Sequence, residues 1–430
     1  MDTNDKNYRN PDAVLDIYDK PPLGSWFILS LQHLFSMFGS TVLVPLLVGL
    51  DPSIALFSSG VGTILHILIT KRRIPAYMSS SFSFIVPSIA LMKTVGFPAV
   101  AQGTIAVGAV YLIVALLVGF VGYGWIDKAL PPIVVGPIVI VIGLALAGSA
   151  ATDSTMNNGT YDLKFFGIAM FTLITTVFFN MYLKGFLSNI AILLGIISGY
   201  LLSVILGVVN FSKVASSPWF ALPSFEIPFI NYTPHTIYWG AILSFAPLAF
   251  VTMAEHLGHI MVLDELTHRN FFKDPGLHRT LAGDGTASIV AGLLGGPPIT
   301  SYGENIGVMA VNKIYSVYVI IGAAVFAAVF GFVGKLSALI QTVPGPVIGG
   351  ISFVLFGVIA SNGLKILIDN KVDFSQKRNL MIGSVILVIG IGNAMLQIGS
   401  FQFSGIGVAT IFGIALNLIL PKEARSEEKE

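Results

Sequence analysis

The feature that most constrains this chain is a run of apolar residues that recurs from Ser25 to Leu420, with only short polar breaks between runs. Each run has the roughly 20 residues that an α-helix needs to cross a bilayer, and about fourteen runs can be counted. Only 10% of the 430 residues are charged, against about 25% in a typical soluble domain. The sequence therefore predicts an all-α polytopic membrane protein.

The distribution of basic residues predicts the orientation of these spans. With the N-terminus in the cytoplasm, all but four of the 23 Lys and Arg residues fall on the cytoplasmic side. The four on the outer side are Lys93, Lys164, Lys213 and Lys335. The positive-inside rule then predicts cytoplasmic termini and an even number of spans.

An internal repeat indicates two halves of seven spans each. Pro132 to Gly136 followed by Gly143 recurs as Pro346 to Gly350 followed by Gly357, with the same spacing. Because seven is odd, the second half would enter the membrane with opposite polarity, as in many alternating-access carriers. Coincidental spacing in glycine-rich helices is the alternative explanation.

Two segments at corresponding places in the halves are poor helix formers. They run from Pro75 to Phe82 and from Gly295 to Glu304, and each combines proline with small polar residues. Non-helical backbone at bilayer depth is tolerated only where it is buried in protein or lines a wet cavity. We interpret these segments as a substrate site, the alternative being two tightly packed helices.

Acidic side chains within the spans point to the same region. The sequence indicates just two that lie well inside an apolar span, Glu255 and Glu304. An ionisable residue at such a depth is a functional candidate by default. His259 follows Glu255 by one helical turn, on the same face. Because burial disfavours the charged form of both groups, the pair is suited to proton exchange.

The remaining polar groups give weaker signals. His256 points to a different face of the helix and is expected either to snorkel or to hydrogen-bond a neighbour, and His33 could be a structural hydrogen-bonder in the first span. Glu255, His256 and His259 could ligate a metal, but no further ligand clearly completes a site, so neither a metal nor another cofactor is expected. The chain has no Cys and lacks common catalytic motifs, so an enzyme is not expected.

Five stretches carry a resemblance to a known family: Ser30 to Gly39, Ile74 to Phe82, Ala254 to His259, Asp274 to Arg279, and Tyr302 to Ala310. They resemble the nucleobase–ascorbate transporter family, and the resemblance extends from about Pro21 to Leu420. The last stretch is similar to the family signature, which commonly begins with glutamine in purine carriers and glutamate in uracil carriers. Glu304 therefore favours uracil.

The resemblance implies fourteen spans as 7+7 inverted repeats, with short antiparallel β-strands in the broken third and tenth segments. It implies a core domain that moves against a gate domain in the cytoplasmic (inner) membrane. The implied parts are residues 1–128 and 232–338 for the core, and 129–231 and 339–430 for the gate, including a cytoplasmic tail. A homodimer through the gate domain is a further expectation.

The resemblance also implies roles for individual residues. For substrate binding these are Glu255, Glu304, Gly303, Phe82, Tyr302, Ser81 and Ser40, with Phe82 and Gly303 acting through backbone amides. For proton coupling they are His259, Glu304 and Glu255. His33, Asn305 and Gly307 are expected to be structural or signature positions.

Two departures from the family pattern are expected to tune selectivity, namely Asn312 in place of threonine and Phe356 in place of tyrosine. The expected function is proton-coupled uracil uptake, with uracil, a proton and the lipid bilayer as partners and no nucleic acid. Xanthine or urate is the alternative substrate. An anion or solute channel on a similar fold and, more remotely, a membrane enzyme acting on a lipid are the alternatives of a different class.

Overall fold

The computed structural model describes residues 8–234, 236–398 and 401–421. The C-terminal tail expected from Lys422 onward lies outside these residues. Among the residues that are described, seven helices are long and apolar enough to cross a membrane, and four shorter apolar helices have 10–17 residues. The chain is therefore a multi-pass, mainly helical membrane protein.

The first half contains α1 (Leu23–Val48), α2 (Pro52–Ile69), β1 (Met78–Ser80), η1 (Phe82–Phe84), α3 (Ile85–Thr94), α4 (Phe97–Val121), α5 (Gly124–Ala129), α6 (Pro132–Leu144), α7 (Ala147–Thr155), β2 (Met156–Asn157), β3 (Thr160–Tyr161), α8 (Leu163–Tyr182), α9 (Phe186–Asn189), α10 (Ala191–Ile205) and α11 (Ser212–Ser216). The second half contains α12 (Trp239–Thr267), η2 (Phe272–Gly276), α13 (Leu277–Leu294), β4 (Ile299–Ser301), α14 (Gly303–Asn312), α15 (Val317–Gly331), α16 (Gly334–Gln341), α17 (Gly345–Asp369), α18 (Lys377–Ile391), β5 (Leu396–Ile398), β6 (Phe401–Phe403) and α19 (Gly405–Ile419).

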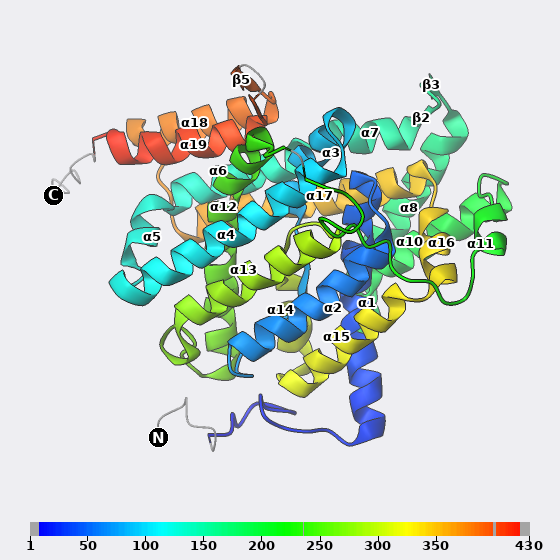
Figure 1. The fold of residues 1–430 in the computed structure, drawn as a ribbon, viewed down its shortest axis with the longest axis horizontal. Helices are drawn as coiled ribbons and strands as arrows, with labels where there is room; N and C mark the ends of the chain where they lie inside the picture. Colours follow the sequence, from blue (N-terminus) through cyan, green and yellow to red (C-terminus); the bar gives the residue numbers. More distant parts are fainter. Residues whose placement is uncertain (1–7, 235, 399–400, 422–430) are drawn as a thin grey trace.

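The helices pack as two groups. In the first helix group, α1 to α4 and α12 to α15, the helices α4, α13, α2 and α15 lie side by side in that order, and α1 packs against α15 (Figure 1). In the second helix group, α6 to α8, α10 and α17 to α19, α17 packs against α6, α7 and α8, and α18 lies beside α19. The main helix contacts between the groups are those of α1 with α10 and of α12 with α6 and α19.

Glycine permits the closest helix approach in the first group. A Cβ on Gly108 of α4 would lie 2.3 Å from the carbonyl oxygen of Gly285 on α13, and a Cβ on Gly285 would lie 2.8 Å from that of Gly108. Small residues let membrane helices approach backbone to backbone. In lipid, where the hydrophobic effect does not drive helices together, the van der Waals contacts of this close approach stabilise the pair. This crossing fixes α13 against α4.

The start of α2 shows how the sequence directs a helix boundary. Asp51 is the N-cap, and its Oδ1 accepts a hydrogen bond from the backbone N–H of Ser53 at 2.9 Å. Pro52 occupies the first helical turn, where its missing N–H costs nothing. Asp51 also accepts hydrogen bonds from Ser337 and Ser224, at 2.6 and 2.7 Å. The cap therefore ties α2 to α16 and to the loop before α12.

Candidate functional site

The two broken segments lie side by side. β1 pairs antiparallel with β4, with Met78 opposite Ser301 and Ser80 opposite Ile299. The short antiparallel strands expected in these segments are thereby confirmed. β1 leads through η1 into α3, and β4 leads into α14. The N-terminal ends of two short helices, with their unpaired N–H groups and positive dipole ends, therefore begin at one strand pair.

Side chains from neighbouring helices satisfy the outer edges of this two-stranded sheet. The backbone N–H of Met78 donates to Thr63 Oγ1 at 2.9 Å, and that of Ile299 to Ser288 Oγ at 3.3 Å. The N–H of Ser301 donates to Asp284 Oδ2 at 3.3 Å. An unpaired N–H at bilayer depth would cost several kcal/mol. These three side chains make the non-helical backbone tolerable there.

A cavity of about 210 Å³ lies at the ends of the strands. Its walls come from both helix groups, with α12 and the two broken segments on one side and α6 and α17 on the other. The sequence-predicted residues that line it are Ser81, Phe82, Glu255, His259, Tyr302, Gly303 and Glu304. Seven positions expected to act together are thus brought together, although they come from two distant parts of the chain.

The two glutamates face this cavity. Glu255 lies in the middle of α12 and Glu304 in the first turn of α14, and both side chains are exposed in the cavity. A carboxylate in the first turn of a helix is stabilised by the helix dipole. Carboxylates accept hydrogen bonds from ligand N–H groups, while free backbone N–H groups donate to ligand carbonyl oxygens. The arrangement suits a small polar heterocycle.

Aromatic and imidazole rings border the same space. The rings of Phe82 and Tyr302 are nearly parallel, at 9°, with centroids 6.4 Å apart. The Tyr302 hydroxyl donates to the carbonyl of Ser80 at 2.7 Å, which fixes the ring. His259 Nδ1 lies 3.2 Å from Ser301 Oγ. A Cβ on Gly303 would lie 2.9 Å from His259 Nε2, so only glycine leaves this approach free.

The signature positions occupy different surroundings. His33 Nδ1 lies 2.9 Å from Asn305 Oδ1, and Asn305 Nδ2 donates to the carbonyl of Pro75 at 3.1 Å, so these two residues tie α1 and α14 to the first broken segment. Gly307 has no atom within 4 Å of where a Cβ would be. Ser40 is buried in α1 and is not part of the cavity wall. A role for Ser40 in substrate binding stays a prediction.

The expectation that only two acids lie well inside the spans is wrong. Asp284 lies within α13 and is fully buried. Its Oδ1 is 2.9 Å from His66 Nδ1, and its Oδ2 is 3.0 Å from His256 Nδ1. His256 also lies 2.8 Å from Thr280 Oγ1 and 3.0 Å from Ser301 Oγ. His256 hydrogen-bonds its neighbours, as its sequence context suggested, but the partner acid was missed.

A signal for Asp284 was present in the sequence. It is a lone acid among small residues, in Leu281-Ala-Gly-Asp284-Gly, within a span that has no other acid. Asn362 of α17 also lines the cavity and had no comparable signal, because it carries no charge and its position depends on packing between the two helix groups. Asn312 and Phe356, the two departures from the family pattern, are not in the cavity wall.

Apolar helices around a polar cavity, with two half-helices starting at its wall, define a multi-pass membrane protein of the carrier type. The chain belongs to the permease family Xan_ur_permease, which matches residues 24–399. It is therefore a transporter and not an enzyme.

Relatives of known name support this assignment. The chain is 53% identical to the uracil permease of Bacillus caldolyticus over 419 residues, which cover 96% of each chain. It is 43% identical to the uracil permease of Escherichia coli (strain K12) over 409 residues, 94% of each. Its fold is similar to that of the murine anion transporter solute carrier 26 family member A9, with a TM-score of 0.70 at 11% identity, covering 93% of this chain and 68% of that one.

Proposed function

We propose that this permease carries uracil together with a proton into the cell across the cytoplasmic membrane. The observation that carries the proposal is the convergence of Glu255, Glu304 and two half-helix N-terminal ends on one cavity. Uracil presents N–H groups and carbonyl oxygens around one ring, which match carboxylate acceptors and backbone N–H donors. Relatives named as uracil permeases, 43% and 53% identical over nearly the whole chain, support this substrate.

The proposed mechanism is alternating access. Residues 1–128 and 232–338 form the core domain, and residues 129–231 and 339–430 form the gate domain. The first helix group falls within the former ranges and the second within the latter. A cavity whose walls come from both groups changes shape when one group moves against the other, which is how a carrier exposes a site to each side in turn.

The proposed membrane arrangement has fourteen spans in two inverted halves, with both termini in the cytoplasm and a homodimer formed through the gate domain. The charge distribution supports the orientation. Among the described residues, seven long and four shorter apolar helices support a multi-pass arrangement. The pairing of the two broken segments, one from each half of the chain, supports the repeat.

Proton coupling is assigned to Glu304, His259 and Glu255. His259 and both carboxylates line the cavity, so a proton on any of them would be within reach of the substrate. Uptake of labelled uracil into proteoliposomes should therefore increase with an inward proton gradient. An uptake rate that is the same with and without this gradient would refute proton coupling.

Substitutions separate binding from coupling. Glu255→Ala removes an acceptor of charge-assisted hydrogen bonds, each contributing about 1.5–3 kcal/mol, so Kd for uracil should rise roughly 10- to 150-fold. Glu304→Gln should weaken binding and change the pH profile of transport. Glu265→Ala is the matched control for Glu255→Ala, because Glu265 is exposed near the end of α12, outside the cavity. Normal transport by both cavity variants would place the site elsewhere.

Competition and flux measurements distinguish the alternative substrates and a channel from a uracil carrier. If xanthine or urate displaces labelled uracil at equal or lower concentration, the preferred substrate is a purine. A channel would give flux that does not saturate and no exchange of labelled for unlabelled substrate. Saturable uptake with exchange is expected of the carrier.

A further inference from the structure

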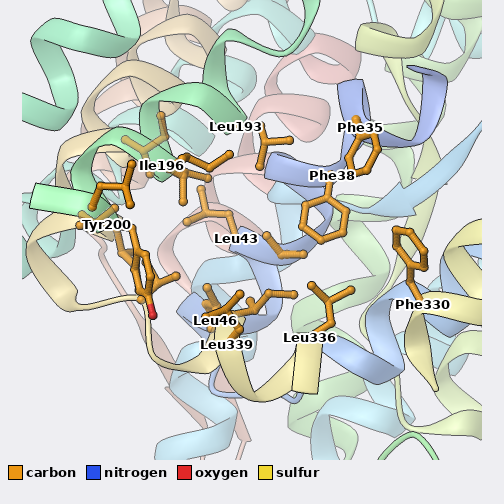
Figure 2. Close-up of a pocket in the computed structure, with 18 of the residues that line it drawn as sticks. Phe35, Phe38, Leu43, Leu46, Leu193, Ile196, Tyr200, Phe330, Leu336 and Leu339 are labelled. Atoms are coloured by element: carbon orange, nitrogen blue, oxygen red, sulfur yellow. The ribbon is translucent and has the colours of Figure 1, made fainter. Parts of the chain in front are cut away.

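A second and larger cavity, of about 610 Å³, lies away from the substrate site. Its walls come from α1, α10, α16 and the start of α17, at the junction of the two helix groups. Figure 2 shows side chains such as Phe38, Leu46, Leu193 and Leu339 pointing into it from different helices. Its volume falls in the range of about 300–1,000 Å³ that is usual for ligand pockets.

The wall of this cavity is almost purely hydrocarbon. The only oxygen among the side chains drawn in Figure 2 belongs to Tyr200, and its hydroxyl already lies 2.7 Å from Thr342 Oγ1. Water needs two to four polar partners to occupy a cavity, and none is offered here. An empty cavity of this size would forfeit dispersion contacts along its whole lining. The cavity therefore suits an apolar occupant.

The cavity opens onto an apolar part of the protein surface. Of the lining residues, Ile197, Leu201 and Leu339 are 45%, 56% and 38% exposed. In a membrane-spanning protein, such exposed apolar side chains contact acyl chains. A lipid tail can thus enter from the side without crossing any polar barrier.

Two lysines stand near the Tyr200 end of the cavity. The Tyr200 ring contacts Phe211, two residues before Lys213 of α11. Lys213 Nζ donates to Gln341 Oε1, and Gln341 follows the lining residue Ile340. On α16, Lys335 Nζ donates to the carbonyl of Val214 at 2.9 Å.

Neither lysine is matched by a carboxylate in the described part of the chain, although Lys335 Nζ lies 5.5 Å from the centroid of the Trp219 ring. Among the described residues, neither Lys213 nor Lys335 makes a salt bridge. The acid near α16, Asp51, is already engaged by Ser337, Ser224 and Ser53. Both lysines are among the four basic residues that the charge distribution places on the outer side. Positive charge at the end of an apolar cavity complements an anionic headgroup above an acyl chain.

We propose that this cavity binds an anionic phospholipid, with an acyl chain between α1, α10 and α16 and the phosphate near Lys213 and Lys335. An acyl chain gains little free energy on moving from the bilayer into this cavity, because both are hydrocarbon. The lysines therefore provide the preference for anionic over neutral lipid. At a membrane surface each lysine favours anionic lipid by about fivefold. Because the cavity joins the two helix groups, the bound chain contacts both.

The absence of cysteine from the chain makes a direct test simple. Leu201→Cys, at the cavity mouth, is labelled with a fluorophore and reconstituted in phosphatidylcholine containing either dibrominated phosphatidylglycerol or dibrominated phosphatidylcholine. Val388→Cys is the control, because Val388 is 73% exposed near the end of α18 and does not line the cavity. Uracil uptake is measured only to establish that each variant is folded.

Bromine should quench the Leu201→Cys label at least twofold more strongly from phosphatidylglycerol than from phosphatidylcholine, with no such difference for Val388→Cys. Lys213→Gln with Lys335→Gln should abolish the preference, and Leu193→Trp, which fills the cavity, should reduce quenching by both lipids. Equal quenching by the two lipids in the parent Leu201→Cys protein, or a preference that survives loss of both lysines, would overturn the headgroup assignment. Quenching unchanged by Leu193→Trp would overturn the acyl-chain assignment.

Discussion

Replacement of Asp284 by asparagine tests how the buried polar cluster holds the strand pair. Asp284 is fully buried and contacts His66 at 2.9 Å, His256 at 3.0 Å and the N–H of Ser301 at 3.3 Å. Asp284→Asn keeps the shape of the side chain and one oxygen that can accept from Ser301. It removes the charge and turns an amide N–H₂ toward one of the imidazoles.

The size of the effect follows from what the substitution leaves behind. Removal of one partner from a buried ion pair costs about 3–5 kcal/mol, because the other charge stays buried and uncompensated. Loss of neutral hydrogen bonds alone would cost about 1–3 kcal/mol. With two imidazoles on one carboxylate, we expect Asp284→Asn to lower the free energy of unfolding by about 1–5 kcal/mol, the range that spans neutral hydrogen bonds and an ion pair.

The assay is reversible unfolding in mixed detergent and dodecyl sulfate micelles, followed by tryptophan fluorescence. Asp373→Asn is the matched control. Asp373 is exposed and accepts a hydrogen bond from the N–H of Ser375 at 2.8 Å, so its substitution should leave the midpoint of unfolding nearly unchanged. A double-mutant cycle with His256→Gln should give a coupling energy of about 1–3 kcal/mol. An Asp284→Asn protein as stable as the control would refute the reasoning.

Two further predictions concern helix packing and capping. Gly285→Ala should cost about 1–3 kcal/mol in unfolding free energy, because its Cβ would lie 2.8 Å from the Gly108 carbonyl. Gly167→Ala, with nothing within 4 Å, should be neutral or stabilising in the same measurement; equal losses would contradict the close crossing. Burial raises the pKa of Asp51, but hydrogen bonds from Ser337, Ser224 and Ser53 outweigh it and leave that pKa below its ordinary value. A depressed pKa stabilises the fold above the unfolded-state pKa of about 3.9. The roughly 1 kcal/mol cost of Asp51→Ala at neutral pH should therefore shrink as pH falls below about 4; a pH-independent cost would show that the charge contributes nothing.

The parts of the site that could be predicted are those whose signal is local. Proline and small polar residues within an apolar sequence marked both broken segments, and the glutamates stood out because a carboxylate in a span is rare. Asp284 carried the same kind of signal and was overlooked.

The positions of other site residues depend on tertiary packing, so no local sequence pattern indicates them. His66 becomes a partner of Asp284 only because α2 packs against α13. Asn362 reaches the cavity only because α17 lies opposite the strands. Ser40 was expected at the site and is not among the residues of the cavity wall, whereas its neighbour Thr41 lies 2.7 Å from Ser79 of the first broken segment.

The pairing of β1 with β4 has a consequence for the folding of the chain during synthesis. The Tyr302 hydroxyl donates to the carbonyl of Ser80 across 222 residues of sequence, so the first broken segment leaves the ribosome long before its partner is made. During that interval its backbone groups have no strand to pair with, in a medium where unpaired groups are costly. Of the partners described here, Thr63 of α2 is already made and can accept from the N–H of Met78. The first broken segment reaches its final hydrogen-bonded form only after the second half has been synthesised.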